Sequence, residues 1–234
     1  MTNPAKVMYL APLPDGRSHA DFRARWRGHG ALAMGLSLWE HHTRYKQCDT
    51  IVAGEHGVSE DVIARMHNGQ YGGVGMIWLD LDPVMGLVDD VETMAVDEVD
   101  TFGRRLGANL VPTEEHVIVD GEPGPITLVA ALHRVDGVDR AGFKAGWLAV
   151  GAEFLARPAL TGNVCRYVQN HAFPDAEYCD GFVEMSFASV EQMGAFMGEL
   201  KGSGLLDMER EFLDHRRNEA VLTHENLLFE RASA

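Results

Sequence analysis

The feature that most constrains the fold of this chain is that the two halves of its sequence carry the same motifs in the same order. The segment FRARW at residues 22–26 is matched by FKAGW at residues 143–147, which begins 121 positions later. RYKQ at residues 44–47 is matched by RYVQ at residues 166–169, 122 positions later. Matching segments in the same order and at nearly equal spacing indicate an internal duplication, which decides the architecture before any local pattern does.

A third pair of segments shows where the two copies differ in length. GGVGMIWL begins at Gly72 and DGFVEMSF at Asp180, and these starts are only 108 positions apart. Half one therefore carries an insert of about 14 residues relative to half two, which we place near residues 55–70. The predicted organisation is one ferredoxin-like half over residues 1–121 and a second over residues 122–234, with a Gly- and Pro-rich turn between them.

Both halves show the same alternation of strand and helix patterns. An apolar run of strand length is followed by a helix with an apolar stripe, two strands, a second helix and a last strand. This β-α-β-β-α-β order is the ferredoxin-like split motif, and two such open sheets need to cover each other. We expect an α+β fold in which two ferredoxin-like repeats form a pseudo-symmetric α/β barrel. The strands are predicted at residues 6–10, 44–47, 74–79 and 115–119, and at 126–133, 166–169, 182–187 and 220–229, with the second helices near residues 83–91 and 190–200.

Charge and composition narrow the possible partners. The formal net charge is −15, from 20 basic and 35 acidic residues, which argues against a nucleic acid or an anionic membrane surface as partner. The three cysteines have no paired spacing. With neither a secretory signal nor a membrane-length apolar run in the sequence, we expect a cytoplasmic protein with a small-molecule substrate. A homodimer is a further expectation.

The repeated motifs resemble those of a known family. A helix with the pattern F-x-x-x-W, a strand with R-Y-x-Q and then DG before an apolar strand are similar to the EthD family of the dimeric α/β-barrel superfamily. The resemblance covers both halves, so this chain resembles a tandem, fused form. It implies an enzyme of aromatic-compound catabolism or of biosynthesis, of lyase, isomerase or cofactor-free monooxygenase type. The wider superfamily also includes haem proteins.

One position departs from the family pattern. In the family, a His commonly follows the Trp by four residues and precedes Gly-Pro. Here His29 follows Trp26 by three residues, and Ala31 stands in place of the Pro. The resemblance still carries the family's His onto His29.

Comparing the two copies points to candidate site residues. His29 lies on the apolar stripe where half two has Val150, and His42 and Lys46 correspond to Val164 and Val168. Because side chains alternate along a strand, His42, Arg44 and Lys46 are expected to share one face. Buried polar groups need partners or water, so this pattern predicts a pocket between helix and sheet in half one.

These residues suit cofactor-independent proton abstraction from a small apolar or aromatic carbonyl or phenolic compound. The predicted base is His29 or His42, because imidazole titrates near working pH. Arg44, with Lys46, would stabilise the oxyanion. Trp26 and Tyr45 would supply flat walls. The product chemistry would be of isomerase, lyase or cyclase type.

Other interpretations stay open at this point. Tyr45 and Gln47 recur as Tyr167 and Gln169, so the opposite strand face could be an ordinary feature of a barrel interior. Tyr167, His171 and Glu184 could also line a second pocket in half two, although Glu184, in place of Met76, is more simply a solvent-facing charge.

Two function classes compete with the enzyme. A haem-binding α/β-barrel protein would need an axial histidine, and a non-catalytic small-ligand-binding module would need none. No metal-ligand spacing, nucleotide-binding loop or nucleophile elbow is present in the sequence, so we predict no metal site and no cofactor.

Overall fold

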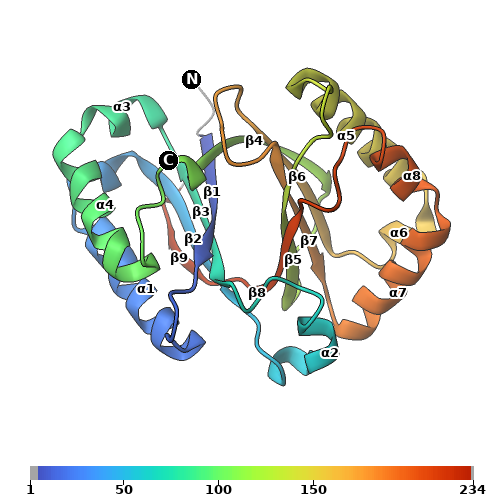
Figure 1. Ribbon diagram of the computed structural model, residues 1–234, viewed down its shortest axis with the longest axis horizontal. Helices are drawn as coiled ribbons and strands as arrows, with labels where there is room; N and C mark the ends of the chain where they lie inside the picture. The colour runs from blue at the N-terminus through green and yellow to red at the C-terminus, as the bar shows by residue number, and fades with distance from the viewer. Residues whose placement is uncertain (1–4, 233–234) are drawn as a thin grey trace.

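The computed structural model describes residues 5–232 and contains the predicted element order twice (Figure 1). The helices flank a central ring of strands, with one half of the chain on each side. Half one consists of β1 (Ala5–Pro12), α1 (His19–Met34), β2 (His42–Thr50), β3 (Tyr71–Leu79), α4 (Val88–Phe102) and β4 (Val111–Val119). Half two consists of β5 (Ile126–Leu132), α5 (Arg140–Leu155), β6 (Arg166–Ala172), β7 (Gly181–Phe187), α7 (Val190–Gly202) and β8 (Glu219–His224).

Shorter helices and one further strand connect or extend these repeated elements. The last predicted strand of half two is divided, because β8 ends at His224 and a separate strand, β9 (Leu227–Glu230), follows it. The second helix of half one starts later than predicted, at Val88, because the short helix α3 (Leu81–Gly86) precedes it. The remaining short elements are α2 (Glu60–Ile63), α6 (Pro158–Thr161), α8 (Leu205–Glu209) and the 3₁₀ turns η1 (Ser37–His41), η2 (Glu55–Gly57) and η3 (Gly107–Asn109).

The strands close into a ring of eight. The order is β3-β1-β4-β6-β7-β5-β8-β2, and β2 pairs back onto β3, while β9 adds to the first part of β2. Three antiparallel pairings join the halves: β4 with β6, β8 with β2 and β9 with β2. The fold is thus an α+β barrel of two ferredoxin-like repeats, as predicted.

The helix starts follow from local sequence. Ser18 caps α1 by accepting a hydrogen bond from the Asp21 amide, and Asp139 caps α5 through the Gly142 amide. Such caps satisfy amides that have no partner inside the helix. Each helix then buries its predicted aromatic stripe, with Phe22 and Trp26 in α1 and Phe143 and Trp147 in α5.

A repeated hydrogen-bond motif fixes each first helix to its sheet. The Gln47 side-chain amide donates to the Trp26 carbonyl and to the Tyr45 hydroxyl, at 2.8 and 2.6 Å. Gln169 makes the corresponding bonds to Trp147 and Tyr167, at 2.8 and 2.9 Å. The strand face that carries Tyr and Gln therefore faces the helices in both halves and not the barrel interior.

The predicted insert packs against the other half. Val58, with Val62, Ile63 and Met66 beside it, joins an apolar cluster that contains Phe154, Phe187 and Leu222 of half two. The Asn68 side chain bridges the Ile51 and Leu222 carbonyls. The extra residues of half one therefore cover the helix layer of half two.

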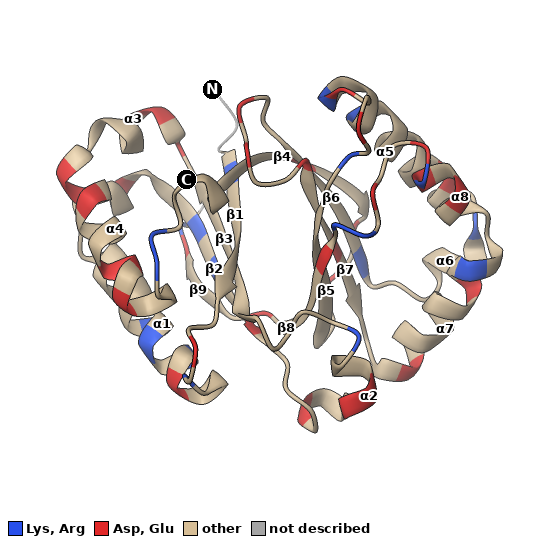
Figure 2. Cartoon of the chain, viewed as in Figure 1, with Lys and Arg blue, Asp and Glu red and all other residues tan. Residues whose placement is uncertain are grey.

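Figure 2 shows acidic residues on the outer helices of both halves. Within residues 5–232, none of the helices has both the length and the apolar character needed to cross a membrane.

Candidate functional site

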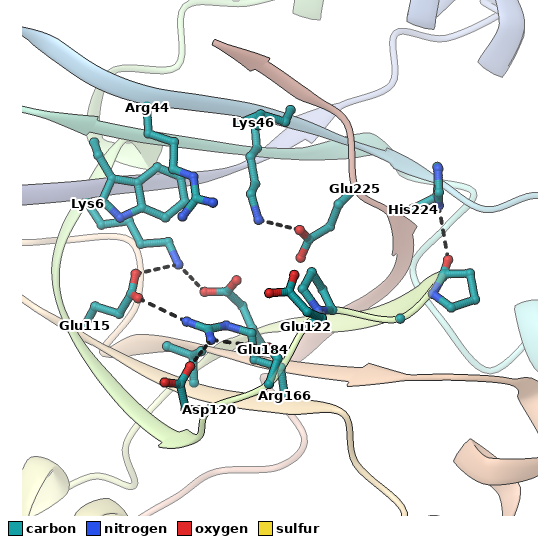
Figure 3. A pocket seen from close by; sticks show the side chains of 17 residues that line it. Lys6, Arg44, Lys46, Glu115, Asp120, Glu122, Arg166, Glu184, His224 and Glu225 are labelled. Atoms are coloured by element: carbon teal, nitrogen blue, oxygen red, sulfur yellow. Dashed lines mark hydrogen bonds and ion pairs between the residues drawn. The ribbon is translucent and has the colours of Figure 1, made fainter. Parts of the chain in front are cut away.

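A cavity of about 720 Å³ lies inside one end of the strand ring. Its walls come from both halves, and the linker of residues 120–125 forms its rim (Figure 3). Beyond it, the middle of the ring is filled by apolar side chains such as Met8, Val74 and Phe182. The cavity is therefore a polar chamber above an apolar plug.

Ionisable side chains dominate the chamber. Four are cationic, five are acidic and one is a histidine, and all ten are labelled in Figure 3. They are Lys6, Arg44, Lys46 and Arg166, then Glu115, Asp120, Glu122, Glu184 and Glu225, and finally His224. A chamber with this lining suits a ligand with polar or charged groups.

Lys6 anchors the centre of the chamber. Its side chain is 2% exposed, and its ammonium group forms an ion pair with Glu184 and lies 3.1 Å from Glu115. Burial by itself lowers the pKa of Lys6, but attraction from Glu184 and Glu115 outweighs burial, so the pKa lies above its ordinary value. Lys6 is therefore a permanent buried cation, held by two carboxylates.

Glu184 lies on β7 between Lys6 and Asn170. Its Oε1 atom accepts a hydrogen bond from the Asn170 side-chain amide at 2.6 Å and from Lys6. Within residues 5–232, its second carboxylate oxygen has no hydrogen-bond partner. Glu184 is 8% exposed and lines the chamber, so the interpretation of this residue as a solvent-facing charge is wrong.

Lys46 and Arg166 each have carboxylate partners in the chamber. Lys46 forms an ion pair with Glu225. Arg166 lies 2.8 Å from Asp120 and 3.7 Å from Glu115. Burial raises the pKa of Glu115, but Lys6 and Arg166 together bring it below its usual range, so this carboxylate is ionised.

Close backbone packing holds the rim in place. A Cβ atom on Gly124 would lie 2.1 Å from the Phe187 carbonyl oxygen, and one on Gly121 would lie 2.3 Å from that of Cys165. Only glycine allows the linker to approach the barrel so closely. His224 adds a contact between its Nδ1 and the Pro125 carbonyl oxygen at 3.2 Å.

The structure brings only part of the predicted site together. Arg44 and Lys46 do share a face, but that face is the chamber and not the helix side of the sheet. His29 lies on the other side of the sheet, with its Nδ1 2.7 Å from Asp97 and its ring 5.2 Å from that of Phe102. A single pocket that combines His29 and Arg44 is therefore not present.

His42 departs from the expected strand face for a local reason. The pairing of β2 with β3 shifts register between His42 and Arg44, and such a bulge changes the side to which a side chain points. The His42 ring stacks on Trp39 at 4.5 Å, and Trp39 also contacts Tyr45. His42 thus groups with the helix-facing residues.

The predicted substrate-binding residues divide in the same way. Trp26, Tyr45, Tyr167 and His171 are buried in the two helix–sheet layers, and Lys46 is the one that lines the chamber. Lys6, Trp78, Glu115 and Glu225 belong to the chamber and were missed. The signal in the sequence that could have revealed the chamber is Lys6, a lone lysine in an otherwise apolar strand.

The helix-side histidines do not fit a haem. The His29 ring is held by Asp97 and Phe102, and the His171 ring packs on Trp147 and His116 at 4.7 and 4.9 Å. His215 is exposed and lies 3.5 Å from Glu209. None of these three histidines lines the chamber, so none of them presents an axial nitrogen to it; His224 is the histidine of the chamber, and its Nδ1 contacts the Pro125 carbonyl oxygen. Within residues 5–232, no three His, Cys, Asp or Glu side chains are placed to hold a metal ion.

A second, smaller cavity of about 490 Å³ lies beside the end of β5. Two of its arginines are occupied, because Arg134 and Arg140 both bind the buried Asp180 carboxylate. Arg140 also donates to the Phe173 and Ala176 carbonyls. The arginines of this cavity therefore mainly hold the loop of residues 173–180 in place.

Comparison with known proteins supports the fold alone. No family model and no curated protein matches the sequence. An anthrone oxidase-like protein has the same fold, with a TM-score of 0.59 at 10% identity over 100% of this chain and 97% of that chain. A chlorite dismutase variant from Candidatus Nitrospira defluvii matches with a TM-score of 0.51 at 11% identity, over 95% of this chain and 92% of that one.

These likenesses define the class as α+β barrels of the ferredoxin-like type. At such low identity they say nothing about the reaction of this chain. Membership of the EthD family stays a prediction, and so do the fused-tandem origin and the homodimer.

Proposed function

We propose that this chain is an enzyme that abstracts a proton from a small organic compound held in the chamber of the barrel. The observation that carries this proposal is the position of Glu184. It is a buried, oriented carboxylate inside a cavity large enough for a small molecule, at the strand position where half one has the apolar Met76. A duplicated fold does not require an acid at this position.

Glu184 is the base in this proposal. Lys6 and Asn170 hold its Oε1 atom, so the second oxygen is left to take the proton. A positioned general base contributes roughly 10²–10⁴-fold to a rate. Proton abstraction by a carboxylate needs no cofactor, which agrees with the cofactor-independent class predicted from the sequence.

Lys46 stabilises the negative charge that develops on the substrate oxygen. Its side chain lines the same chamber and is 13% exposed, and its ammonium group has Glu225 as its partner. Cations fixed in a poorly hydrated site stabilise an enolate or phenolate more strongly than water does. The substrate class is therefore a carbonyl or phenolic compound, and the reaction is an isomerisation, a cyclisation or a lyase-type cleavage.

This proposal replaces the histidine base that the sequence favoured. His29 and His42 lie outside the chamber, so a catalytic role for either stays a prediction that the arrangement of the chamber does not support. Arg44 and Lys46 are the members of the predicted set that remain in the proposed site.

Glutamine in place of Glu184 tests the base. The protein would be screened by thermal shift against small ketones, phenols and keto acids, and compounds that bind would be incubated in D₂O. NMR would then follow deuterium exchange at carbons next to the carbonyl or hydroxyl group. We expect Glu184→Gln to slow exchange by at least about 100-fold while binding changes little, because glutamine keeps the size of the side chain.

Glu177→Gln serves as the matched control, because Glu177 is exposed at the second cavity. It should leave exchange unchanged. Exchange that survives Glu184→Gln at the wild-type rate would remove Glu184 as the base. Binding with no exchange in the wild type would instead favour a ligand-binding module.

A further inference from the structure

Arg44 differs from the other cations of the chamber in its partner. Lys6, Lys46 and Arg166 each have a carboxylate partner among the residues that line the cavity. The ion pair of Arg44 is with Glu230, a residue that is 52% exposed and does not line the cavity. Arg44 therefore brings a positive charge into the chamber that no chamber carboxylate neutralises.

The guanidinium group of Arg44 is already oriented. Its Cζ lies 5.3 Å from the centre of the Trp78 ring, and its Nε lies 3.2 Å from the Glu230 carboxylate. Within residues 5–232, its two Nη groups form no hydrogen bond. Figure 3 shows Arg44 on the side of the chamber opposite Arg166. A guanidinium in this state presents a two-pronged donor at little further entropic cost.

Arg166 provides the internal comparison. It is the counterpart of Arg44 in the second repeat and lines the same chamber. Its Nη1 donates to Asp120 at 2.8 Å, and Glu115 lies 3.7 Å away. The duplication therefore placed one arginine on each side of the chamber, and only one of them remains open to a ligand.

The charge of the chamber selects the kind of anion. Five acidic side chains line it against four basic ones. A dianion such as a phosphate ester would be repelled by the nearby glutamates, whereas one open guanidinium matches a single planar carboxylate through paired N–H···O bonds.

We propose that the substrate carries one carboxylate group, which Arg44 binds through its two Nη groups, with Trp78 as a positioning residue for Arg44. This inference rests on the proposed function, since it names the substrate class of the same chamber. It places the carboxylate at Arg44 and the carbon that loses its proton towards Glu184.

Matched pairs of ligands and of variants test this inference. The probes are phenylpyruvate, acetoacetate and 4-hydroxybenzoate, each beside its uncharged ester or amide, with benzylamine as a cation. Titration calorimetry on the full chain would measure Kd for wild type, Arg44→Gln and Arg166→Gln.

We expect at least one acid to bind tenfold or more tightly than its neutral partner. Arg44→Gln should weaken that acid about 10–100-fold, as expected for a lost charged hydrogen bond. Arg166→Gln should change its Kd less than about threefold, the scale of a rearranged surface ion pair.

Trp78→Ser introduces the residue found in the second repeat, Ser186, and should weaken acid binding less than Arg44→Gln does. Arg44→Lys should recover only part of the affinity, because an ammonium cannot bind a carboxylate through a planar fork.

Several outcomes would overturn the carboxylate inference. These are equal binding of acids and esters, equal losses in the two glutamine variants, or binding of benzylamine alone. If neutral carbonyl compounds bind and Glu184→Gln still stops exchange, the proposed function stands and only the role of Arg44 fails. If no probe binds, charged or neutral, both proposals fail together.

Discussion

At the scale of single residues, the most costly feature of this protein is the buried lysine of β1. Lys6 is 2% exposed and has Glu184 and Glu115 as partners. Taking an ammonium group out of water costs several kcal/mol, and the two carboxylates offset this cost only as a complete set. A buried arrangement of this kind contributes little net stability by itself.

Removing one member should therefore be worse than removing two. We expect Lys6→Met to destabilise the protein by roughly 3–5 kcal/mol, because Glu184 would be left as an unpaired buried charge. Lys6→Met with Glu184→Met should recover much of that loss, since methionine is the residue that half one carries at the corresponding position, Met76. Urea unfolding at pH 7 would measure both. A double variant that is less stable than Lys6→Met alone would contradict this account.

Residue-scale reasoning also shows why His42 was misassigned. Alternation along β2 correctly placed Arg44 and Lys46 on one face. It failed two residues earlier because a register shift separates His42 from Arg44. A bulge is decided by how two strands meet, and the sequence of one strand alone does not show it.

At the scale of elements, the glycines of β3 are explained by the helix that covers them. A Cβ atom on Gly73 would lie 2.4 Å from both the Trp26 ring and the Cys48 carbonyl oxygen. One on Gly72 would lie 2.2 Å from the Phe22 ring. The aromatic stripe of α1 and the glycines of β3 therefore form one interlocking unit, because large rings need a flat surface to pack closely.

Alanine at Gly73 tests this unit. We expect Gly73→Ala to cost ~2–3 kcal/mol, because neither the Trp26 ring nor the β2 backbone can move away from an added methyl group without disturbing a packed layer. Gly194→Ala in α7 is the control, since nothing lies within 4 Å of its added Cβ. That change should stabilise by ~0.5–1 kcal/mol, because alanine favours a helix over glycine. Thermal unfolding midpoints would compare the two, and equal effects would refute the packing argument.

At the scale of the whole molecule, neither half has a complete sheet or a complete core by itself. β4 of half one pairs with β6, and β8 of half two pairs with β2. The apolar plug of the ring takes Met8 and Val74 from one half and Val129 and Phe182 from the other. The chamber is likewise shared, so it forms only when both repeats are assembled.

Dividing the chain at the predicted boundary tests this interdependence. We expect residues 1–121 and residues 122–234, produced separately, to lack a cooperative unfolding transition, because each would expose its share of the plug and unpaired strand edges. Mixed together, the two fragments should regain the transition and the ligand binding of the full chain. Circular dichroism on each fragment and on the mixture would decide this, and a stably folded single half would show that the repeats are independent domains.

The amino-acid pattern by itself predicted the repeated motifs, the β-α-β-β-α-β order of each half, the aromatic stripes and the shared strand face of Arg44 and Lys46. These properties are local or periodic, so they can be predicted from the side-chain periods of helices and strands. Tertiary structure alone decided which face of β2 points into the ring, because alternation gives two faces without saying which is inside. It also decided that Lys6, Glu115, Glu184 and Glu225, which are far apart in the chain, meet around one cavity. Their partnership depends on how the eight strands close, and that closure is a property of the whole ring.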